Sequence, residues 1–230
     1  MSLILQIETA TTSCSVALAR VGEVLDFKEI NARNIHAEVI TIYINELLNN
    51  TGISYNDLDA IAVSSGPGSY TGLRIGVSTA KGLCFALDKP LIAIETLEAM
   101  ADGVINNPGF FADDKTLLCP MIDARRMEVY TALFDASGNR VRETAADIID
   151  ENSFADYLLH HKIIFFGDGA EKCKDVLSNN ANAMFLDDFA NSAIYLTERA
   201  AQKFADGNFE DVAYYEPYYL KDFIAGKKTL

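Results

Sequence analysis

The chain has 230 residues, of which 50% are hydrophobic, 10% aromatic and 23% charged, and these proportions exclude a disordered or fibrous protein. With 33 acidic and 19 basic residues, the formal net charge is -14. Such an acidic body repels phosphate backbones, so we expect no tight, autonomous binding to nucleic acid. The largest basic clusters are Arg125-Arg126 and Gly226-Lys227-Lys228.

The sequence carries no signal for a membrane or an oxidising compartment. Its four cysteines are scattered, without a zinc-binding spacing, and are interpreted as reduced, buried residues. The apolar start of the chain lacks a basic segment, contains Glu8 and alternates like a strand, so we do not interpret it as a signal peptide. No window approaches the roughly 18 apolar residues of a membrane span. We therefore expect a cytoplasmic protein.

Three short apolar runs, separated by a hydroxyl-rich turn and by Gly22, predict an antiparallel meander at the start of the chain. A helix with an unusually broad apolar face should follow, then a strand, a glycine-rich loop, a second helix and another strand. The resulting order is β-β-β-α-β-α-β. The expected strands are Leu3–Ile7, Cys14–Ala19, Val24–Ile30, Leu58–Ser64 and Leu91–Ile94, and the expected helices are Ile35–Leu48 and Gly72–Leu87.

A second stretch of the same type follows, which predicts a duplicated α/β fold. Pro108-Gly109 and a polar stretch separate the halves, so we expect a domain of residues 1–110 and a second domain of residues 111–230. The last helix is a candidate for packing back on the first domain. The expected elements are the strands Leu117–Ile122, Glu128–Phe134, Val141–Ala145 and Ile163–Phe166 and the helices Ser153–His160 and Asn191–Phe204.

The turn after the first strand is rich in hydroxyl groups and follows an acidic residue. Such a turn can present backbone N–H groups to a phosphate, with the carboxylate holding a metal-bound water. The same residues also suit a tight, capped turn that binds nothing. The residues of this candidate phosphate turn are Glu8, Thr9, Thr11 and Thr12.

The segment "SGPGSYTGLRIG" joins a glycine loop to the start of a helix, where Ser69 or Thr71 can cap the first turn. It is no Walker loop, because Lys81 lies well inside the helix. Within this helix, Gly72, Gly76 and Ala80 share one face, and the small residues Ser78, Gly82 and Ala86 share a neighbouring one. Together with the broad apolar face of the preceding helix, these small residues predict either a protein interface or two deeply buried core helices.

Recognisable catalytic constellations are missing from the sequence. Of the three histidines, His36 has no second histidine four residues later, and His160-His161 resembles a polar helix end. No HExxH or GxSxG motif occurs. Asp123 and Glu128 flank a turn and could hold a metal, but such pairs in an acidic protein are usually solvated. We therefore predict no catalytic residue, no cofactor and no metal.

Three stretches of the first half closely resemble the bacterial TsaB (YeaZ) family, and shorter ones continue the likeness in the second half. The first three are "ILQIETATTSCSVAL", "SSGPGSYTGLRIGVSTAKGLCFAL" and "PLIAIETLEAM"; the shorter ones are "DARRMEVY", "GDGAEK" and "PYYLKD". The resemblance implies the ASKHA fold, a duplicated actin-like α/β unit in two subdomains. It also implies an accessory subunit for synthesis of N6-threonylcarbamoyladenosine at position 37 of tRNAs.

According to the resemblance, the chain is a non-catalytic paralogue of the catalytic subunit TsaD. It would form a heterodimer with TsaD and activate it, TsaE would join, tRNA would be reached only through the complex, and the free chain could pair with itself. The nucleotide loop of ASKHA enzymes would be replaced by Gly167, Asp168 and Gly169, where the carboxylate disfavours a phosphate. The partner-binding residues are then expected to be His36, Val39, Ile40, Ile42, Tyr43, Leu47, Ser69, Tyr70, Thr71, Gly72, Arg74, Gly76 and Ala80.

Two other classes of function remain open from the residues alone. An ASKHA ATPase or phosphotransferase would use the candidate phosphate turn and the Gly167–Gly169 loop. A glycoprotease-like peptidase is the third alternative, but the three histidines offer neither a metal pair nor a triad.

Overall fold

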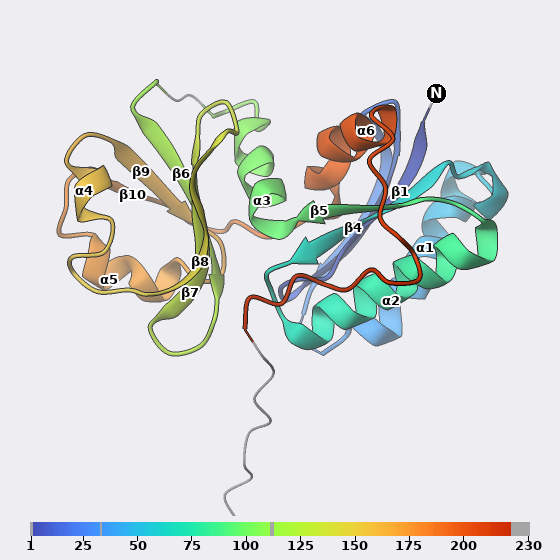
Figure 1. Ribbon diagram of the computed structural model, residues 1–230, viewed down its shortest axis with the longest axis horizontal. Helices are drawn as coiled ribbons and strands as arrows, with labels where there is room; N and C mark the ends of the chain where they lie inside the picture. Colours follow the sequence, from blue (N-terminus) through green and yellow to red (C-terminus); the bar gives the residue numbers. More distant parts are fainter. Residues whose placement is uncertain (1, 33, 111–112, 222–230) are drawn as a thin grey trace, which may run out of the picture.

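Two five-stranded sheets, one in each half of the chain, form the two lobes of this computed structural model (Figure 1). The structure describes residues 2–32, 34–110 and 113–221. The predicted basic cluster Gly226-Lys227-Lys228 therefore lies outside the described residues. Within the described ranges, no helix is both long and apolar enough to cross a membrane.

The first sheet begins with the predicted antiparallel meander and continues with two parallel strands. Its spatial order is β3-β2-β1-β4-β5. Both faces of the central strands are covered, so nearly every residue of β1 and β2 is buried, although the sequence pattern suggests alternation. The strands are β1 (Leu3–Glu8), β2 (Ser13–Arg20), β3 (Glu23–Asn31), β4 (Ala60–Gly66) and β5 (Leu91–Glu95).

The second sheet repeats this topology strand for strand. Its order, read from the opposite edge, is β8-β7-β6-β9-β10, with an antiparallel meander followed by two parallel strands. The helices between its strands are much shorter than those of the first lobe. The strands are β6 (Thr116–Asp123), β7 (Glu128–Asp135), β8 (Arg140–Ile148), β9 (Lys162–Phe166) and β10 (Ala183–Leu186), and the short helices are α4 (Ala155–Leu158) and α5 (Lys174–Leu177).

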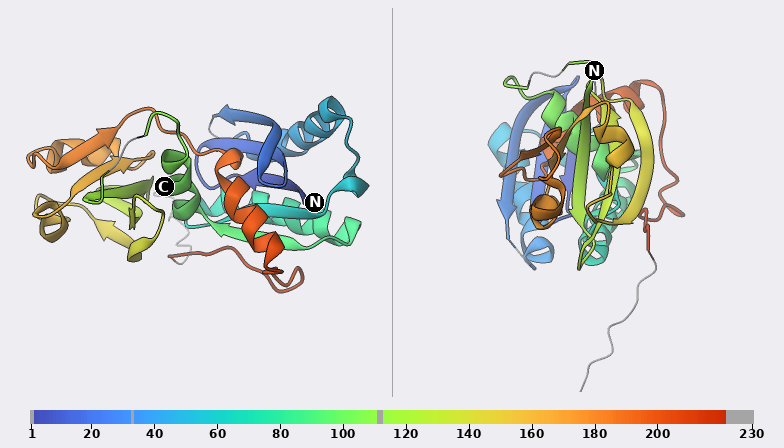
Figure 2. Two further views of the ribbon diagram at one scale, coloured as in Figure 1. Left: turned by 90° about the horizontal axis from the view of Figure 1, so that it is seen from above. Right: turned by 90° about the vertical axis from the view of Figure 1, so that its left-hand side faces the viewer.

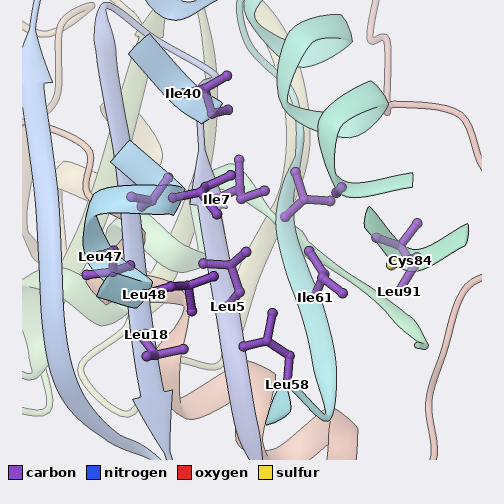
Figure 3. Packing of buried hydrophobic residues seen from close by; sticks show 14 of the residues in the cluster. Leu5, Ile7, Leu18, Ile40, Leu47, Leu48, Leu58, Ile61, Cys84 and Leu91 are labelled. Atoms are coloured by element: carbon purple, nitrogen blue, oxygen red, sulfur yellow. The ribbon is translucent and has the colours of Figure 1, made fainter. Parts of the chain in front are cut away.

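Helices α1 (His36–Thr51) and α2 (Tyr70–Leu87) cover one face of the first sheet. Figure 3 shows their buried side chains interlocking with those of β1, β2 and β4, for example Ile40 and Leu47 near Ile7 and Leu18. Gly52 ends α1 in a left-handed conformation, as a C-terminal glycine often does. Ser69 caps α2 by accepting a hydrogen bond from the backbone N–H of Gly72 at 3.2 Å.

Helix α3 (Thr96–Ile105), which the sequence did not predict, lies between the two sheets (Figures 1 and 2). One side, around Ala99, belongs to the core of the first sheet. The other side, around Leu97 and Met100, packs on Phe134 and Phe166 of the second sheet. The helix is therefore part of both cores.

The last described segment returns to the first lobe. The 3-10 helix η3 (Ala193–Leu196) and α6 (Thr197–Ala205) pack on the face of the first sheet opposite α1 and α2. The chain then runs along α2 (red in Figure 1), where Lys81 Nζ donates to the carbonyls of Ala213 and Tyr215 at 3.3 and 2.8 Å. One predicted helix, Asn191–Phe204, is thus a 3-10 turn followed by an α-helix.

Candidate functional site

The β1–β2 turn, the candidate phosphate turn of the sequence, is closed by the chain itself. Glu8, Thr9, Ala10 and Thr11 are all buried, and Thr12 is half-buried. The loop before α2 lies on top of them: the Ser69 backbone N–H donates to the Ala10 carbonyl at 2.7 Å. Two N–H groups of the turn are also used within the chain: Ala10 N–H donates to Glu8, and Ser13 N–H donates to the Thr11 hydroxyl.

The glycines of α2 make this cover possible. A Cβ at Gly72 would collide with the carbonyl oxygen of Thr9, and one at Gly76 would collide with the Thr9 hydroxyl. That hydroxyl in turn donates to the Gly72 carbonyl at 2.8 Å. The expectation that Gly72 and Gly76 admit a partner's helix is therefore wrong, because the backbone that approaches them is the chain's own β1–β2 turn.

Glu8 is a buried carboxyl at the carboxyl end of β1, only 1% exposed. Burial raises its pKa from 4.5 to about 7, although the Ala10 backbone N–H, Ser64 and Asn191 all favour its charged form. The Ala10 N–H donates to Glu8 Oε1 at 2.5 Å. The carboxyl is therefore occupied within the turn and is not directed at solvent.

His36 holds the start of α1 to the same turn. Its Nε2 lies 3.0 Å from the Thr11 carbonyl and 3.1 Å from the Ser13 carbonyl, so this nitrogen carries the proton and donates. The ring is 7% exposed. The side chain is thus buried by contacts within the chain, and the expected contact of His36 with a partner stays a prediction.

The loop Gly167–Gly169 in the second lobe packs against the end of β6. The Gly169 N–H donates to the Met121 carbonyl, and a Cβ at Gly167, where φ is +99°, would meet both that carbonyl and Met100. Asp168 Oδ1 accepts the backbone N–H of Asp123 at 3.0 Å. The carboxylate that the sequence places in the nucleotide loop thus serves as a turn acceptor.

The alternative metal pair Asp123 and Glu128 is neutralised by lysines. Lys172 pairs with Asp123, and Lys221 pairs with Glu128. Among the residues that the structure describes, no three His, Cys, Asp or Glu side chains are grouped so as to hold a metal ion.

The surface that α1 and α2 leave exposed combines apolar and small residues. Ile42 is 52% exposed and Phe85, which the sequence did not single out, is 86% exposed. A Cβ at Gly82 would meet nothing within 4 Å, so the small face of Ser78, Gly82 and Ala86 is open. We call this the α1–α2 surface; its exposed or half-buried members are Val39, Ile42, Tyr43, Ser69, Tyr70, Thr71, Arg74, Ser78, Gly82, Phe85 and Ala86.

The structure divides the predicted partner-binding residues into two groups. Arg74 lies on the exposed surface with its guanidinium 4.2 Å from the Tyr70 ring centroid, and that ring packs at a tilt against Tyr219, with 4.8 Å between the centroids. The other group is buried in the first lobe, where its side chains pack within the chain. Its members are His36, Ile40, Leu47, Gly72, Gly76 and Ala80.

The strand order repeated in the two sheets is that of a two-lobed, duplicated α/β fold, actin-like as the ASKHA resemblance implies. It confirms the predicted fold class. A family model described as "TsaD: tRNA N6-adenosine threonylcarbamoyltransferase" matches residues 29–223. The "tRNA threonylcarbamoyladenosine biosynthesis protein TsaB" of Escherichia coli is 32% identical over 98% of this chain and 97% of its own length. The chain belongs to the TsaB (YeaZ) family, which confirms the resemblance.

Two further similarities connect the chain to the same group. The solved structure of YeaZ from Pseudomonas aeruginosa superposes with a TM-score of 0.81 at 26% identity, covering 96% of this chain and all of that one. The tRNA N6-adenosine threonylcarbamoyltransferase of Staphylococcus haemolyticus is 41% identical over 109 residues, which are 40% of this chain and 32% of the enzyme.

Proposed function

We propose that this chain is the accessory subunit of a threonylcarbamoyltransferase complex. It pairs with TsaD and activates it for the transfer step that makes N6-threonylcarbamoyladenosine in tRNA, and TsaE joins the pair. It acts in the cytoplasm and reaches tRNA only within the complex, and the free chain pairs with itself through the same helices. The observation that carries this proposal is the exposed apolar α1–α2 surface on a member of the TsaB family.

A non-catalytic role is supported by how the chain uses its own candidate site residues. In an enzyme of this fold, the turn after β1 must face the substrate phosphate. Here that turn lies beneath the α2 glycines, and Glu8 is buried with a pKa of about 7. If the chemistry takes place on the partner, these residues can serve packing and capping alone without lowering the activity of the complex.

The interface is expected to use the exposed members of the α1–α2 surface. Ile42 and Phe85 are the apolar side chains with most surface left to bury, and Gly82 and Ala86 allow a helix to approach closely. The buried residues His36, Ile40, Leu47, Gly72, Gly76 and Ala80 support this surface from below. They hold the two helices on the sheet and on the β1–β2 turn.

The test is to introduce Ile42→Glu and Phe85→Glu separately and to measure association with the TsaD partner by calorimetry. A carboxylate buried without a partner costs about 3–5 kcal/mol, so we expect affinity to fall by at least about a hundredfold. Both side chains are exposed in the free chain, at 52% and 86%, so melting of the monomer should barely change.

Ile148→Glu is the matched control. Ile148 is 76% exposed, but it lies on β8 of the second lobe, away from the α1–α2 surface. This variant should bind like the unmodified chain. Unchanged binding by Ile42→Glu and Phe85→Glu would move the partner surface elsewhere, and no binding by any form would refute the proposed function.

A further inference from the structure

The β6–β7 connection contains two adjacent arginines in a backbone conformation that arginine rarely adopts. Arg125 and Arg126 have φ values of +72° and +50°. The turn is closed by hydrogen bonds from the Ala124 N–H to the Glu128 carbonyl at 3.0 Å and from the Glu128 N–H to the Arg125 carbonyl at 3.1 Å. Left-handed backbone costs a residue with a Cβ about 1–2 kcal/mol, and Gly, Asn or Asp normally occupy such positions. Two arginines here are a poor choice for folding, which points to a use for their side chains.

The carboxylates nearest to this turn are already engaged. Asp123 pairs with Lys172 and also accepts the Arg125 backbone N–H at 2.9 Å. Glu128 pairs with Lys221. Asp168 accepts the backbone N–H of Asp123.

The two guanidinium groups at the tip of the hairpin therefore have none of these carboxylates as a partner. Arg125 and Arg126 are both exposed, and neither forms an ion pair within the part of the chain that the structure describes. The other two arginines of the second lobe behave differently: Arg140 pairs with Glu95 and Glu98, and Arg142 with Asp147. Lys172 and Lys221 already pair with the carboxylates beside the turn, on a chain whose net charge is -14. The tip therefore presents two exposed guanidinium groups, unpaired among the described residues, on an acidic body.

We propose that Arg125 and Arg126 form a phosphate-contacting turn that binds the RNA backbone when the chain is assembled in its complex. This inference rests on the proposed function. A guanidinium is planar, stays charged and offers several N–H donors at once, which suits phosphate oxygens better than a lysine does. The acidic body prevents the turn from holding RNA alone, so the contact adds to binding sites supplied by the partner.

The experiment uses the full chain assembled with its TsaD partner and an unmodified tRNA transcript, with affinity measured across a range of salt concentrations. Removing two phosphate contacts with Arg125→Ala/Arg126→Ala should weaken tRNA binding. It should also lower the slope of log affinity against log salt by about 1.4–1.8, at roughly 0.7–0.9 per contact. Arg125→Lys/Arg126→Lys keeps the charge and should retain most of the slope.

Two controls test whether a loss of tRNA binding comes from altered folding of the turn or from removing any exposed arginine. Arg125→Asn/Arg126→Gly relieves the backbone strain, so it should raise the melting temperature and still lose the tRNA contact. Arg20→Ala removes an exposed arginine at the end of β2 in the first lobe and should leave the salt slope unchanged. An unchanged slope in the double alanine variant, or a loss of TsaD or TsaE association with tRNA affinity kept, overturns the inference. Neither result contradicts the proposed function. The proposed function fails only if the unmodified chain does not bind TsaD.

Discussion

At the scale of single residues, the β1–β2 turn has a sequence that suggests phosphate binding, but in the structure its residues pack against α1 and α2. Thr9 contributes its carbonyl to the space left by Gly72 and its hydroxyl to the space left by Gly76. His36 donates to the carbonyls of Thr11 and Ser13 in the same turn. Several polar atoms of the turn are therefore used within the chain, and these few contacts can be tested by single substitutions.

Gly72→Ala should lower the free energy of unfolding by about 1–3 kcal/mol, because its Cβ would press on the Thr9 carbonyl in a closely packed site. Gly82→Ala is the control on the same helix. Its Cβ meets nothing within 4 Å, so this variant should be neutral or up to about 1 kcal/mol more stable through helix propensity. Urea unfolding of both variants measures the difference. Equal stabilities would mean that the turn and α2 are not in close contact.

Glu8 gives a prediction for the pH dependence of stability. Its pKa is about 7 in the folded chain and 4.5 as an ordinary carboxyl, so between these values the folded state holds a proton that the unfolded state has lost. The contribution of Glu8 to stability is therefore fully present below about pH 4.5 and falls as pH rises to about 7, by roughly 3 kcal/mol in all.

Glu8→Gln keeps the shape of the side chain and removes its titration. Urea unfolding of both proteins at several pH values isolates this group, because all other titrating groups cancel in the difference. The variant should gain stability relative to the unmodified chain as pH rises from 5 to 8. A difference that is independent of pH would contradict the buried, proton-holding Glu8.

At the scale of helices and strands, the sequence predicts best where an element has one buried and one exposed face. The two meanders and helices α1 and α2 lie where the apolar patterns place them. Helix α3 was missed because it follows β5 directly and is buried on both sides, so it has no polar stripe to reveal its period. The predicted helix Ser153–His160 is only Ala155–Leu158 in the structure.

The candidate site was predictable only in part, for a related reason. Spacing showed that Gly72, Gly76 and Ala80 share a face of α2, but it cannot tell which neighbour approaches that face. Only the fold shows that the neighbour is the chain's own Thr9. Phe85 was missed because one aromatic residue in an apolar helix is indistinguishable, in sequence, from a core residue, and its 86% exposure is visible only in three dimensions.

At the scale of the whole molecule, three features join the two lobes. Helix α3 belongs to the cores of both sheets, and η3 and α6 bring the chain back from the second lobe to the first. Arg140 of β8 forms ion pairs with Glu95 Oε2 at 2.7 Å and with Glu98 Oε1 at 3.0 Å. We therefore propose that the domains expected at residues 1–110 and 111–230 fold as one cooperative unit.

The test is to weaken one lobe and to measure protection of the other by hydrogen exchange. Leu58→Ala and Leu158→Ala form a matched pair, because both side chains are buried at 0% and 3%, one in the first lobe and one in the second. Each should cost about 2–5 kcal/mol through the lost contacts and the cavity. If the lobes unfold together, either variant lowers the protection of the slowest amides in β1 and in β6 by the same free energy, because those amides exchange only through global unfolding. If each variant lowers protection only in its own sheet, the shared helix α3 does not couple the lobes, and the second lobe could then move against the first while the α1–α2 surface stays bound to its partner.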